Sequence, residues 1–480
     1  MGHPNFNSES GENYGKVFYE TTSMCPECET ILPAEVASRN GGVYVIRKCP
    51  EHGKIEGLAC SDVSWFERLS KFDVEPLKPK FHNSNEDRGC PQDCGLCPSH
   101  RQSAGTAAIE ISNKCNLFCP VCLADNQATF ELSVEQVKTI ADDFLANQPS
   151  VDALTVSGGE PTIHPKIFEI LRELDRTGIS RIVLNSNGIR IAEDDVFLDE
   201  LSRHPKVYVS LHHDGKAAKK IRGLDFSIQE KALERLLKWK IKVVPLVLAV
   251  KNENDRDLGK ITMDLLTKSP AVKSVFLSMM AYSGPRGSSF AGDPKTRLTI
   301  PEALARIEEG TDGAIKGKDF MPLPMPNPMC ASIGYFMVLD KEVIPLISLL
   351  DEEKVISFTK NSHFVRAEGE LQTLLKETID RIFSQPGEYL NPEKLLKCFR
   401  QLLQELYPEG KSITVEQRRK LAEERIKTVY LMQFMDAWTF DSVRLAKCSC
   451  QHLLPDKKVV PSCGYYTYHR KAFAKAILKN

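Results

Sequence analysis

The sequence predicts an α/β protein whose central parallel sheet is either doubly wound or closed into part of a barrel. Three observations support this prediction. Short β-rich runs alternate with helical runs in the middle of the chain, a compact set of metal-ligand residues precedes them, and a mainly helical region with further cysteines follows them. Parallel strands need a crossover between them, usually a helix, so a repeated strand–helix order is typical of such a sheet.

Six β-rich runs form the predicted strands of this core, and helical runs lie between them. The expected strands are 107–112, 153–157, 181–185, 207–211, 243–249 and 275–278. The expected helices are 134–147, 165–177, 194–203, 228–238 and 256–267. The first helix follows a capping box, Ser133-x-x-Gln136, which is typical of a helix start. In either fold, binding and catalytic side chains gather at the C-terminal ends of the strands.

The regions on either side of the core differ from it in pattern. In the C-terminal part, Pro392–Leu406 and Val415–Met435 are expected helices, whereas 321–329 (MPLPMPNPM) is too rich in proline for a helix or a central strand. We therefore divide the 480 residues into an N-terminal metal module (1–62), a linker with a cysteine triplet (63–104), the core (105–285) and a C-terminal, mainly helical extension (286–480).

The composition argues against several classes of function. The chain has 63 Lys and Arg and 64 Asp and Glu residues, and its formal net charge of -1 does not favour binding to nucleic acid or to an anionic membrane. No run approaches the ~20 apolar residues that a membrane-spanning helix needs, and Met1–Gly15 lacks the order of a signal peptide. We expect a cytoplasmic protein with no nucleic-acid partner and no transmembrane segment, and peripheral membrane contact stays open.

The cysteines are the unusual feature of this composition. There are 15 of them, and clustered thiols in a reducing compartment more often bind metal than pair with each other. The clearest cluster is Cys115-x-x-x-Cys119-x-x-Cys122, directly after the first core strand. Three thiolates can hold three irons of a [4Fe–4S] cluster and leave the fourth iron open for a small molecule. Zinc or buried free thiols are the alternative.

Polar residues end the core strands that follow. The second strand ends in Ser157-Gly158-Gly159-Glu160, where the glycines would allow a ligand close to the backbone and Glu160 could bind a cationic amine. Asn187 follows the third strand and Ser210 lies in the fourth, and each could contact a nucleoside. Taken alone, the Gly-Gly-Glu run could equally be an ordinary turn, and residues such as Asn187 and Ser210 are more often only turn residues.

Together these residues resemble the radical SAM superfamily over about 107–278. The resemblance implies a partial (β/α)6 barrel in which Cys115, Cys119 and Cys122 hold the catalytic cluster that binds S-adenosylmethionine. One electron, from a donor such as ferredoxin or flavodoxin, would cleave the sulfonium and give a 5′-deoxyadenosyl radical that takes hydrogen from the substrate. The implied S-adenosylmethionine-binding residues are Ser157, Gly158, Gly159, Glu160, Asn187 and Ser210.

A second triplet, Cys90-x-x-x-Cys94-x-x-Cys97, repeats this spacing but precedes the first core strand. No Gly-Gly-Glu turn accompanies it, so we interpret it as an auxiliary iron–sulfur cluster rather than a second cleavage site, with zinc as the alternative.

The N-terminal module contains four ligands in two pairs, Cys25-x-x-Cys28 and Cys49-x-x-His52. This set suits the tetrahedral zinc of a zinc ribbon or a rubredoxin-like mononuclear iron. Cys60 is a spare candidate whose spacing fits less well than that of His52.

The C-terminal extension contains a weaker set of ligand types, namely Cys330, Cys448, Cys450 and Cys463. These cysteines could bind a further iron–sulfur cluster or complete the auxiliary one, and buried structural thiols are the alternative. Cys398 lies in an expected amphipathic helix and is predicted to be a core residue.

Nearly the whole chain resembles the family that contains tetraether lipid synthase and 7,8-dihydro-6-hydroxymethylpterin methyltransferase. Besides the cysteine groups, the resemblance includes Val209–Gly215 (VSLHHDG) and Asp319–Pro322 (DFMP). The chain departs from the family pattern at Met325 and Asn327, where the family has cysteine and histidine, and at His212, where glutamine is common.

This resemblance implies an enzyme that forms a carbon–carbon bond on a lipid chain or methylates a reduced pterin, so the substrate is a lipid or a small molecule. A lipid would need an apolar tunnel, although methionines near a barrel more often only pack in its core. The residues that could line a tunnel are Met279, Met280, Phe320, Met321, Met325 and Met329. A radical SAM peptide-modifying enzyme and a zinc-ribbon binding or regulatory protein are the alternative functions.

Overall fold

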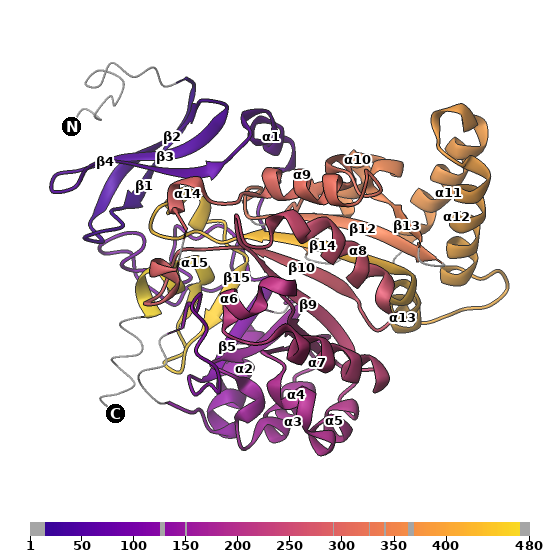
Figure 1. The fold of residues 1–480 in the computed structure, drawn as a ribbon, viewed down its shortest axis with the longest axis horizontal. Helices are drawn as coiled ribbons and strands as arrows, with labels where there is room; N and C mark the ends of the chain where they lie inside the picture. Colours follow the sequence, from indigo (N-terminus) through magenta and orange to yellow (C-terminus); the bar gives the residue numbers. More distant parts are fainter. Residues whose placement is uncertain are drawn as a thin grey trace.

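The computed structural model describes residues 15–124, 130–148, 151–290, 292–325, 327–339, 342–362 and 369–470. The prediction about a signal peptide rests on residues 1–15 and so lies almost wholly outside the described part. Figure 1 shows a small N-terminal sheet beside a larger α/β unit, with helices α11 and α12 at the far end of the molecule from that sheet. No helix among the described residues is long and apolar enough to cross a membrane.

The N-terminal sheet is an antiparallel meander of four strands. The strands are β1 (Val17–Met24), β2 (Ile31–Arg39), β3 (Gly42–Cys49) and β4 (Gly53–Cys60). The turns β1–β2 and β3–β4 carry Cys25, Cys28 and His52, and Cys49 ends β3. Both ligand pairs therefore lie at the same end of the sheet, because in a meander alternate turns share an end. Helix α1 (Val63–Arg68) follows, capped by Asp62.

The core is a curved parallel sheet, as predicted. Its six central strands are neighbours in chain order. They are β5 (Thr106–Ser112), β6 (Ala153–Gly158), β7 (Ile182–Ser186), β8 (Val207–His212), β9 (Lys242–Ala249) and β10 (Ser274–Met279). The helices of this part are α2 (Val134–Asn147), α3 (Ile167–Arg176), α4 (Ile189–Glu193), α5 (Asp195–Ser202), α6 (Ala218–Arg222), α7 (Phe226–Lys238), α8 (Leu258–Lys268) and α9 (Ile300–Gly310). The predicted capping box at Ser133 is present.

The C-terminal extension adds strands to both edges of this sheet. Next to β10 lie β14 (Ile426–Gln433), parallel to it, then β12 (Ala331–Leu339), with β11 (Phe320–Pro322) and β13 (Glu342–Pro345) on its far side. At the other edge, β15 (Cys450–Leu453) runs parallel to β5 and pairs with β16 (Val459–Pro461). The helices are α10 (Glu352–Thr359), α11 (Gly369–Ser384), α12 (Pro392–Leu406), α13 (Val415–Arg425), α14 (Ser442–Leu445) and α15 (Ser462–Gly464).

One predicted element of the extension is wrong in part. The expected helix Val415–Met435 ends at Arg425, and the next eight residues form β14. This run, IKTVYLMQ, contains β-branched and aromatic residues that favour a strand, and it pairs with β10 on one side and β12 on the other. The predicted helix Pro392–Leu406 is confirmed with the same bounds.

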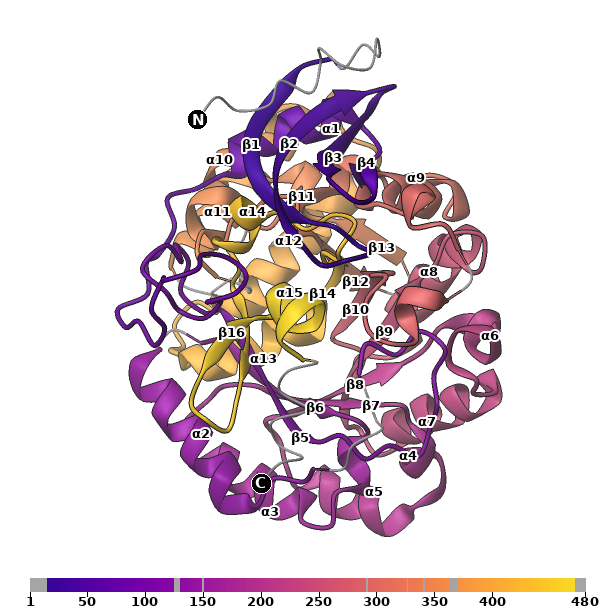
Figure 2. The ribbon, with the colours of Figure 1, turned by 90° about the vertical axis from the view of Figure 1, so that its left-hand side faces the viewer.

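Side chains alternate between the two faces of the core strands. Ile109, Val156, Leu184 and Val209 belong to the main hydrophobic core, which also contains residues of α2, α3, α5, α7 and α8. Residues of the opposite parity therefore face the concave side of the sheet, and Figure 2 shows α15 near the middle of the ring of strands and helices. Interior-facing residues include Glu110, Ser157, Asn185, Ser210 and His212.

The N-terminal sheet is docked on the larger unit through a fully buried arginine, Arg47 of β3. Its two terminal nitrogens donate to the carbonyl oxygens of Trp438 and Ala437 at 2.8 Å each, and Nε donates to the carbonyl of Met24 at 2.8 Å. At Gly57 an added Cβ would lie 1.8 Å from the carbonyl oxygen of Trp438. Only glycine allows the two backbones to approach so closely.

Candidate active site and thiol clusters

The first thiol cluster lies on the loop that leaves the C-terminal end of β5. Cys119 is buried, and Cys115 and Cys122 are partly buried. Burial raises the pKa of Cys115 to about 11, and the charges of Cys119 and Cys122 add to this increase. Such a group of neighbouring thiols fits a site for a metal centre, because a bound cation removes the repulsion between thiolates. Their spacing and number suit a [4Fe–4S] cluster with one open iron.

The Gly-Gly-Glu turn at the end of β6 holds this loop in place. The N–H of Gly159 donates to the carbonyl of Ser112 at 2.7 Å, and the N–H of Glu160 donates to that of Lys114 at 2.8 Å. A Cβ at Gly158, where φ is +128°, would lie 2.0 Å from the Ser112 oxygen, and one at Gly159 would lie 2.1 Å from the Lys114 oxygen. Both glycines are therefore required because the cysteine loop approaches them so closely. This requirement holds whether or not a ligand also lies against them.

Glu160 is buried and already has several donors. Its Oε1 accepts from the Ser186 hydroxyl at 2.9 Å and from the Thr162 hydroxyl at 2.6 Å, and its Oε2 accepts from the N–H of Asn187 at 2.7 Å. Burial raises its pKa, and these hydrogen bonds oppose the increase. The carboxylate thus connects the ends of β6 and β7. A contact between Glu160 and a cationic amine stays a prediction.

The other residues predicted to bind S-adenosylmethionine lie around the same opening. The Asn187 side chain donates to Asn116 of the cysteine loop at 2.7 Å. Ser157 lies opposite Glu110 in the pairing of β6 with β5, and Ser210 lies opposite Asn185 in the pairing of β8 with β7. The fold therefore brings all of the predicted residues to the C-terminal ends of neighbouring strands.

Sequence reasoning missed a buried ion pair next to this loop. Arg222, at the end of α6, donates from Nε to Asp214 at 2.8 Å, and Asp214 also accepts from the N–H of Leu248 at 2.7 Å. Burial disfavours both charges, but the pairing lowers the pKa of Asp214 and raises that of Arg222. Burial also raises the pKa of Cys119, and the charge of Arg222 opposes this effect. The VSLHHDG run of the sequence contains Asp214. Nothing in that run indicated that Arg222 would be its partner.

His212 is the last residue of β8 and faces the barrel interior. In the sequence it is only a departure from the family pattern, with no assigned role. Its Nδ1 is buried without a hydrogen-bond partner among the described residues. Burial lowers its pKa to about 3, so the ring is neutral. A neutral imidazole can donate from one nitrogen and accept at the other, which suits contact with a polar ligand.

A buried carboxylate in the barrel interior meets the C-terminal tail. Glu110 of β5 accepts from the Tyr465 hydroxyl at 3.1 Å and from Arg470 Nη2 at 3.1 Å. The ring of His452 stacks on Tyr465 with centroids 4.4 Å apart, and its Nε2 is 3.1 Å from the Tyr466 hydroxyl. More than 340 positions separate Glu110 from these partners (342 to His452, from 452 minus 110), so no local pattern could have revealed the network.

The four cysteines of the C-terminal extension come together in space. Cys330 precedes β12, Cys448 precedes β15, Cys450 begins β15, and Cys463 lies in α15. Burial raises the pKa of Cys463 to about 12, and the charges of Cys330 and Cys450 contribute. Arg444 is buried and donates from Nε to the Cys330 sulfur at 3.1 Å. Four clustered thiols with a fixed cation fit an anionic iron–sulfur cluster, which stays a prediction.

The Cys90–Cys97 triplet lies next to this set. A hydrogen bond with Cys90 and burial raise the pKa of Cys94, and the charges of Cys448 and Cys97 add to the effect. A Cβ on Gly464 would lie 2.9 Å from the Cys94 sulfur, so the triplet packs against α15. Cys448 therefore lies near the triplet. This position is required if a cysteine of the C-terminal extension completes the auxiliary cluster.

The ligand atoms of Cys25, Cys28, Cys49 and His52 all lie within 4.8 Å of one another. His52 Nδ1 is 3.5 Å from the sulfurs of Cys25 and Cys49. The Thr30 hydroxyl lowers the pKa of Cys28 to about 6, which favours the thiolate that a metal needs. Cys60 instead donates to the carbonyl of Asp62 at 3.3 Å. The four ligand atoms cluster without Cys60, as the preference for His52 requires, and the set fits zinc.

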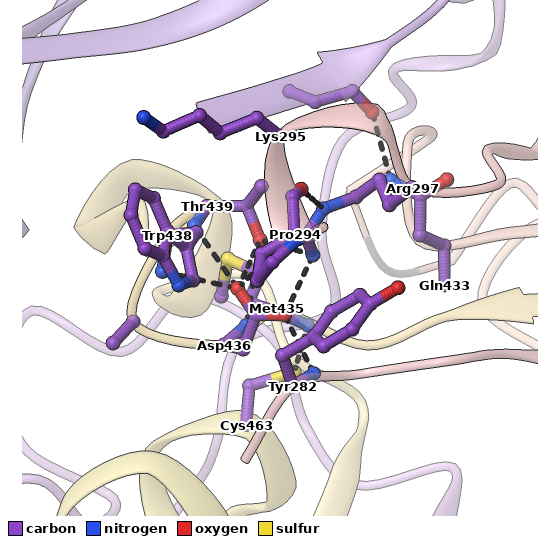
Figure 3. A network of polar contacts seen from close by, with 12 residues as sticks. Tyr282, Pro294, Lys295, Arg297, Gln433, Met435, Asp436, Trp438, Thr439 and Cys463 are labelled. Atoms are coloured by element: carbon purple, nitrogen blue, oxygen red, sulfur yellow. Dashed lines mark hydrogen bonds and ion pairs between the residues drawn. The ribbon is translucent and has the colours of Figure 1, made fainter. Parts of the chain in front are cut away.

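The loops above the barrel are joined by a further buried ion pair, shown in Figure 3. Arg297 donates to both oxygens of Asp436, at 2.6 and 3.1 Å. Asp436 also accepts from the N–H of Tyr282 at 2.8 Å, which ties the loop after β14 to the loop after β10. The same turn accepts the hydrogen bonds of Arg47, and the N–H of Met435 donates to Cys463 at 3.4 Å. One turn therefore links the N-terminal sheet, the barrel loops and the C-terminal thiols.

The matches to two family models agree with this arrangement. The family model of the radical SAM superfamily matches residues 109–265, and that of the HMPTM N-terminal zinc ribbon domain matches residues 17–61. The chain is similar to the 7,8-dihydro-6-hydroxymethylpterin dimethyltransferase of Methanocaldococcus jannaschii, with 27% identity over 496 residues that cover 94% of each chain. It is also similar to the GTP 3′,8-cyclase of Chlorobaculum tepidum, with 26% identity over 42% of this chain and 62% of that protein. Among solved structures, Streptococcus suis SuiB bound to S-adenosylmethionine matches with a TM-score of 0.35 and 17% identity, over 44% of this chain and 47% of that chain.

Proposed function

The chain belongs to the radical SAM superfamily and carries an HMPTM N-terminal zinc ribbon, and from this premise we propose that it methylates a reduced pterin. The observation that carries the proposal is the match to a pterin dimethyltransferase over 94% of both chains. The cluster-bound S-adenosylmethionine would supply a 5′-deoxyadenosyl radical, which can take hydrogen from an unreactive C–H bond. A second S-adenosylmethionine would give its methyl group to the substrate radical and, with one electron from the reductant, leave as S-adenosylhomocysteine.

In this proposal, Cys115, Cys119 and Cys122 hold the cluster at the end of β5. The Gly158-Gly159 turn fixes the loop that carries them through its two backbone hydrogen bonds. The barrel walls exclude water and stray hydrogen donors from the reacting atoms, which is the main contribution of a protein to such chemistry.

The side chains in the barrel interior suit a planar, nitrogen-rich substrate such as a pterin. Glu110 presents a carboxylate that can accept from adjacent N–H groups of a heterocycle, and the rings of Tyr465, Tyr466 and His452 lie beside it. We propose that Glu110 and these three rings contact the pterin. When no pterin is bound, Arg470 and Tyr465 donate hydrogen bonds to the Glu110 carboxylate instead.

The side chains suggested for a lipid tunnel give no comparable support. They are buried, but they belong to different hydrophobic clusters: Met279 and Phe320 to one, Met321 and Met325 to a second, Met280 to a third and Met329 to a fourth. This distribution is that of ordinary core packing, so the lipid alternative is the weaker one.

The test is an anaerobic assay of reconstituted protein with S-adenosylmethionine, a chemical reductant and 6-hydroxymethyl-7,8-dihydropterin. We expect 5′-deoxyadenosine and a pterin that mass spectrometry shows to carry one or two added methyl groups. Cys119→Ala should abolish both products, whereas Cys398→Ala, a change to a buried cysteine of α12, should retain them. An unmodified pterin together with newly joined lipid chains in cells that express the gene would overturn the proposal.

A further inference from the structure

The cysteine loop exposes one large aromatic side chain. Phe118 directly precedes Cys119 and is 76% exposed, whereas Cys119 itself is 9% exposed. A single exposed ring needs no explanation by itself, but this one lies directly beside a predicted cluster ligand and is therefore a candidate contact point. No described side chain covers this one, although the guanidinium of Arg286 lies 5.3 Å from the centre of the ring.

The surface beside Phe118 is basic. Helix α6 ends next to it, because a Cβ on Gly223 would lie 3.9 Å from the carbonyl oxygen of Phe118. Ile221 of α6 packs in one small core with Cys119 and Val121. The segment 215–224 (GKAAKKIRGL) has four basic residues and no acidic one, so its charge stands out in a chain with a net charge of -1.

Only part of this charge is neutralised within the described structure. Arg222 pairs with Asp214, and Lys220 pairs with Glu253 at 2.5 Å. Lys216 and Lys219 are exposed, and neither they nor Arg286 form an ion pair within the part of the chain that the structure describes. Phe118 is therefore an apolar contact point with Arg286 over its ring and with Lys216 and Lys219 on the adjoining basic segment 215–224. An apolar centre with a charged rim is the usual organisation of a protein docking site.

We propose that the surface formed by Phe118, Arg286, Lys216 and Lys219 receives a small acidic protein that carries one electron at low potential. This inference rests on the proposed function, since it supplies the electron that the chemistry requires. The carrier is oxidised by one electron and the cluster is reduced by one electron, and no atom is transferred. Contact at Phe118 places the carrier one residue from the cluster ligand Cys119.

The charge pattern favours this occupant over others. Opposite charge steers association and gives a binding that weakens with salt. Electron-transfer complexes are small and transient, which suits a surface of a few residues. A second copy of the chain, with a net charge of -1, would gain less from the same surface.

The experiment uses reconstituted holoenzyme and flavodoxin, an acidic one-electron carrier, as the probe. Two double variants are compared, Lys216→Glu with Lys219→Glu at the proposed surface, and Lys397→Glu with Arg400→Glu on the exposed side of α12. We expect the Kd for oxidised flavodoxin to rise about tenfold for the first pair and to stay unchanged for the second. For the apolar contact, Phe118→Ala should weaken binding, whereas Phe383→Ala, which removes a 68% exposed ring of α11, should not.

A chemical reductant separates this inference from the proposed function. With dithionite, the variants at the proposed surface should make 5′-deoxyadenosine at the wild-type rate, and with reduced flavodoxin they should make it about tenfold more slowly at limiting carrier. Wild-type affinity in the Lys216/Lys219 variant would overturn the docking surface, as would self-association of the enzyme that Phe118→Ala abolishes. If wild-type protein with dithionite forms no 5′-deoxyadenosine, the proposed function fails, whatever the measured Kd.

Discussion

Asp214 and Arg222 show how single buried charges can set the properties of the cysteine loop. Both side chains are almost completely buried, and their charges act on Cys119 and, from Arg222, on Cys122. Asp214 partly neutralises Arg222, so the loop experiences less positive charge than the arginine alone would give. In a low-dielectric interior, removing that neutralisation has a larger effect than it would at the surface.

We expect Asp214→Asn to raise the midpoint potential of the cluster, because an uncompensated Arg222 stabilises the more negative reduced state. The expected shift is on the order of 60 mV, a tenfold change in a one-electron equilibrium. A redox titration followed by electron paramagnetic resonance measures it. Asp225→Asn, the same change at an exposed helix cap, should leave the potential unchanged. A potential that is lower in Asp214→Asn than in wild type would contradict this account.

At the scale of elements, the junction between β6 and the cysteine loop depends on backbone approach. Gly159→Ala should destabilise the protein by about 2–4 kcal/mol, because its Cβ would overlap backbone that cannot move freely. It should also reduce the iron bound per chain after reconstitution. Denaturant unfolding and iron analysis provide the two readouts. Gly387→Ala, where a Cβ has no atom within 4 Å, is the matched control, and an equal loss there would refute the explanation.

The addition of β14 to the sheet buries Lys427, which makes the stability of the fold depend on pH. Lys427 of β14 is 3% exposed and donates to the carbonyls of Leu266 and, at 2.7 Å, Ser269. Burial lowers its pKa from 10.5 to about 8. Between these two values the unfolded chain binds the proton more tightly than the folded one, so this residue makes stability rise as pH rises from about 8 to 10.5.

Unfolding free energies measured across this pH range test the effect. Lys427→Met keeps the aliphatic stem but lacks the titrating group, so its stability should rise less with pH than that of the wild type. Parallel curves for the two proteins would show that Lys427 does not titrate in this way.

At the scale of the whole molecule, one turn after β14 joins regions from the two ends of the chain. Arg47 of the N-terminal sheet donates to the carbonyls of Ala437 and Trp438, and the adjacent Asp436 binds Arg297. These bonds are buried, and a carbonyl that loses its charged donor stays unpaired. The zinc ribbon is therefore part of the support of the barrel loops and not an independent appendage.

Arg47→Met should lower the free energy of unfolding by about 3 kcal/mol or more, from the loss of hydrogen bonds to a charged donor. Arg39→Met, which removes a partly exposed ion pair with Glu56, should cost at most about 1 kcal/mol. Calorimetry on metal-loaded protein should also show the ribbon unfolding separately in Arg47→Met. A single transition at the wild-type temperature would show that the docking contributes little.

By itself, the sequence determined the elements whose signals are local. Strand–helix alternation predicted the parallel core, a capping box marked the start of α2, and cysteine spacing identified Cys115–Cys122 and the four N-terminal ligands. These features depend on neighbours a few residues apart, so pattern and propensity are sufficient. Only the tertiary structure decided the rest. It converted half of an expected helix into β14 because two strands were available to pair with it. It also brought Cys330 to Cys463, Glu110 to Arg470 and α6 to Phe118, because contacts between residues about a hundred or more positions apart arise from packing and leave no periodic trace in the chain.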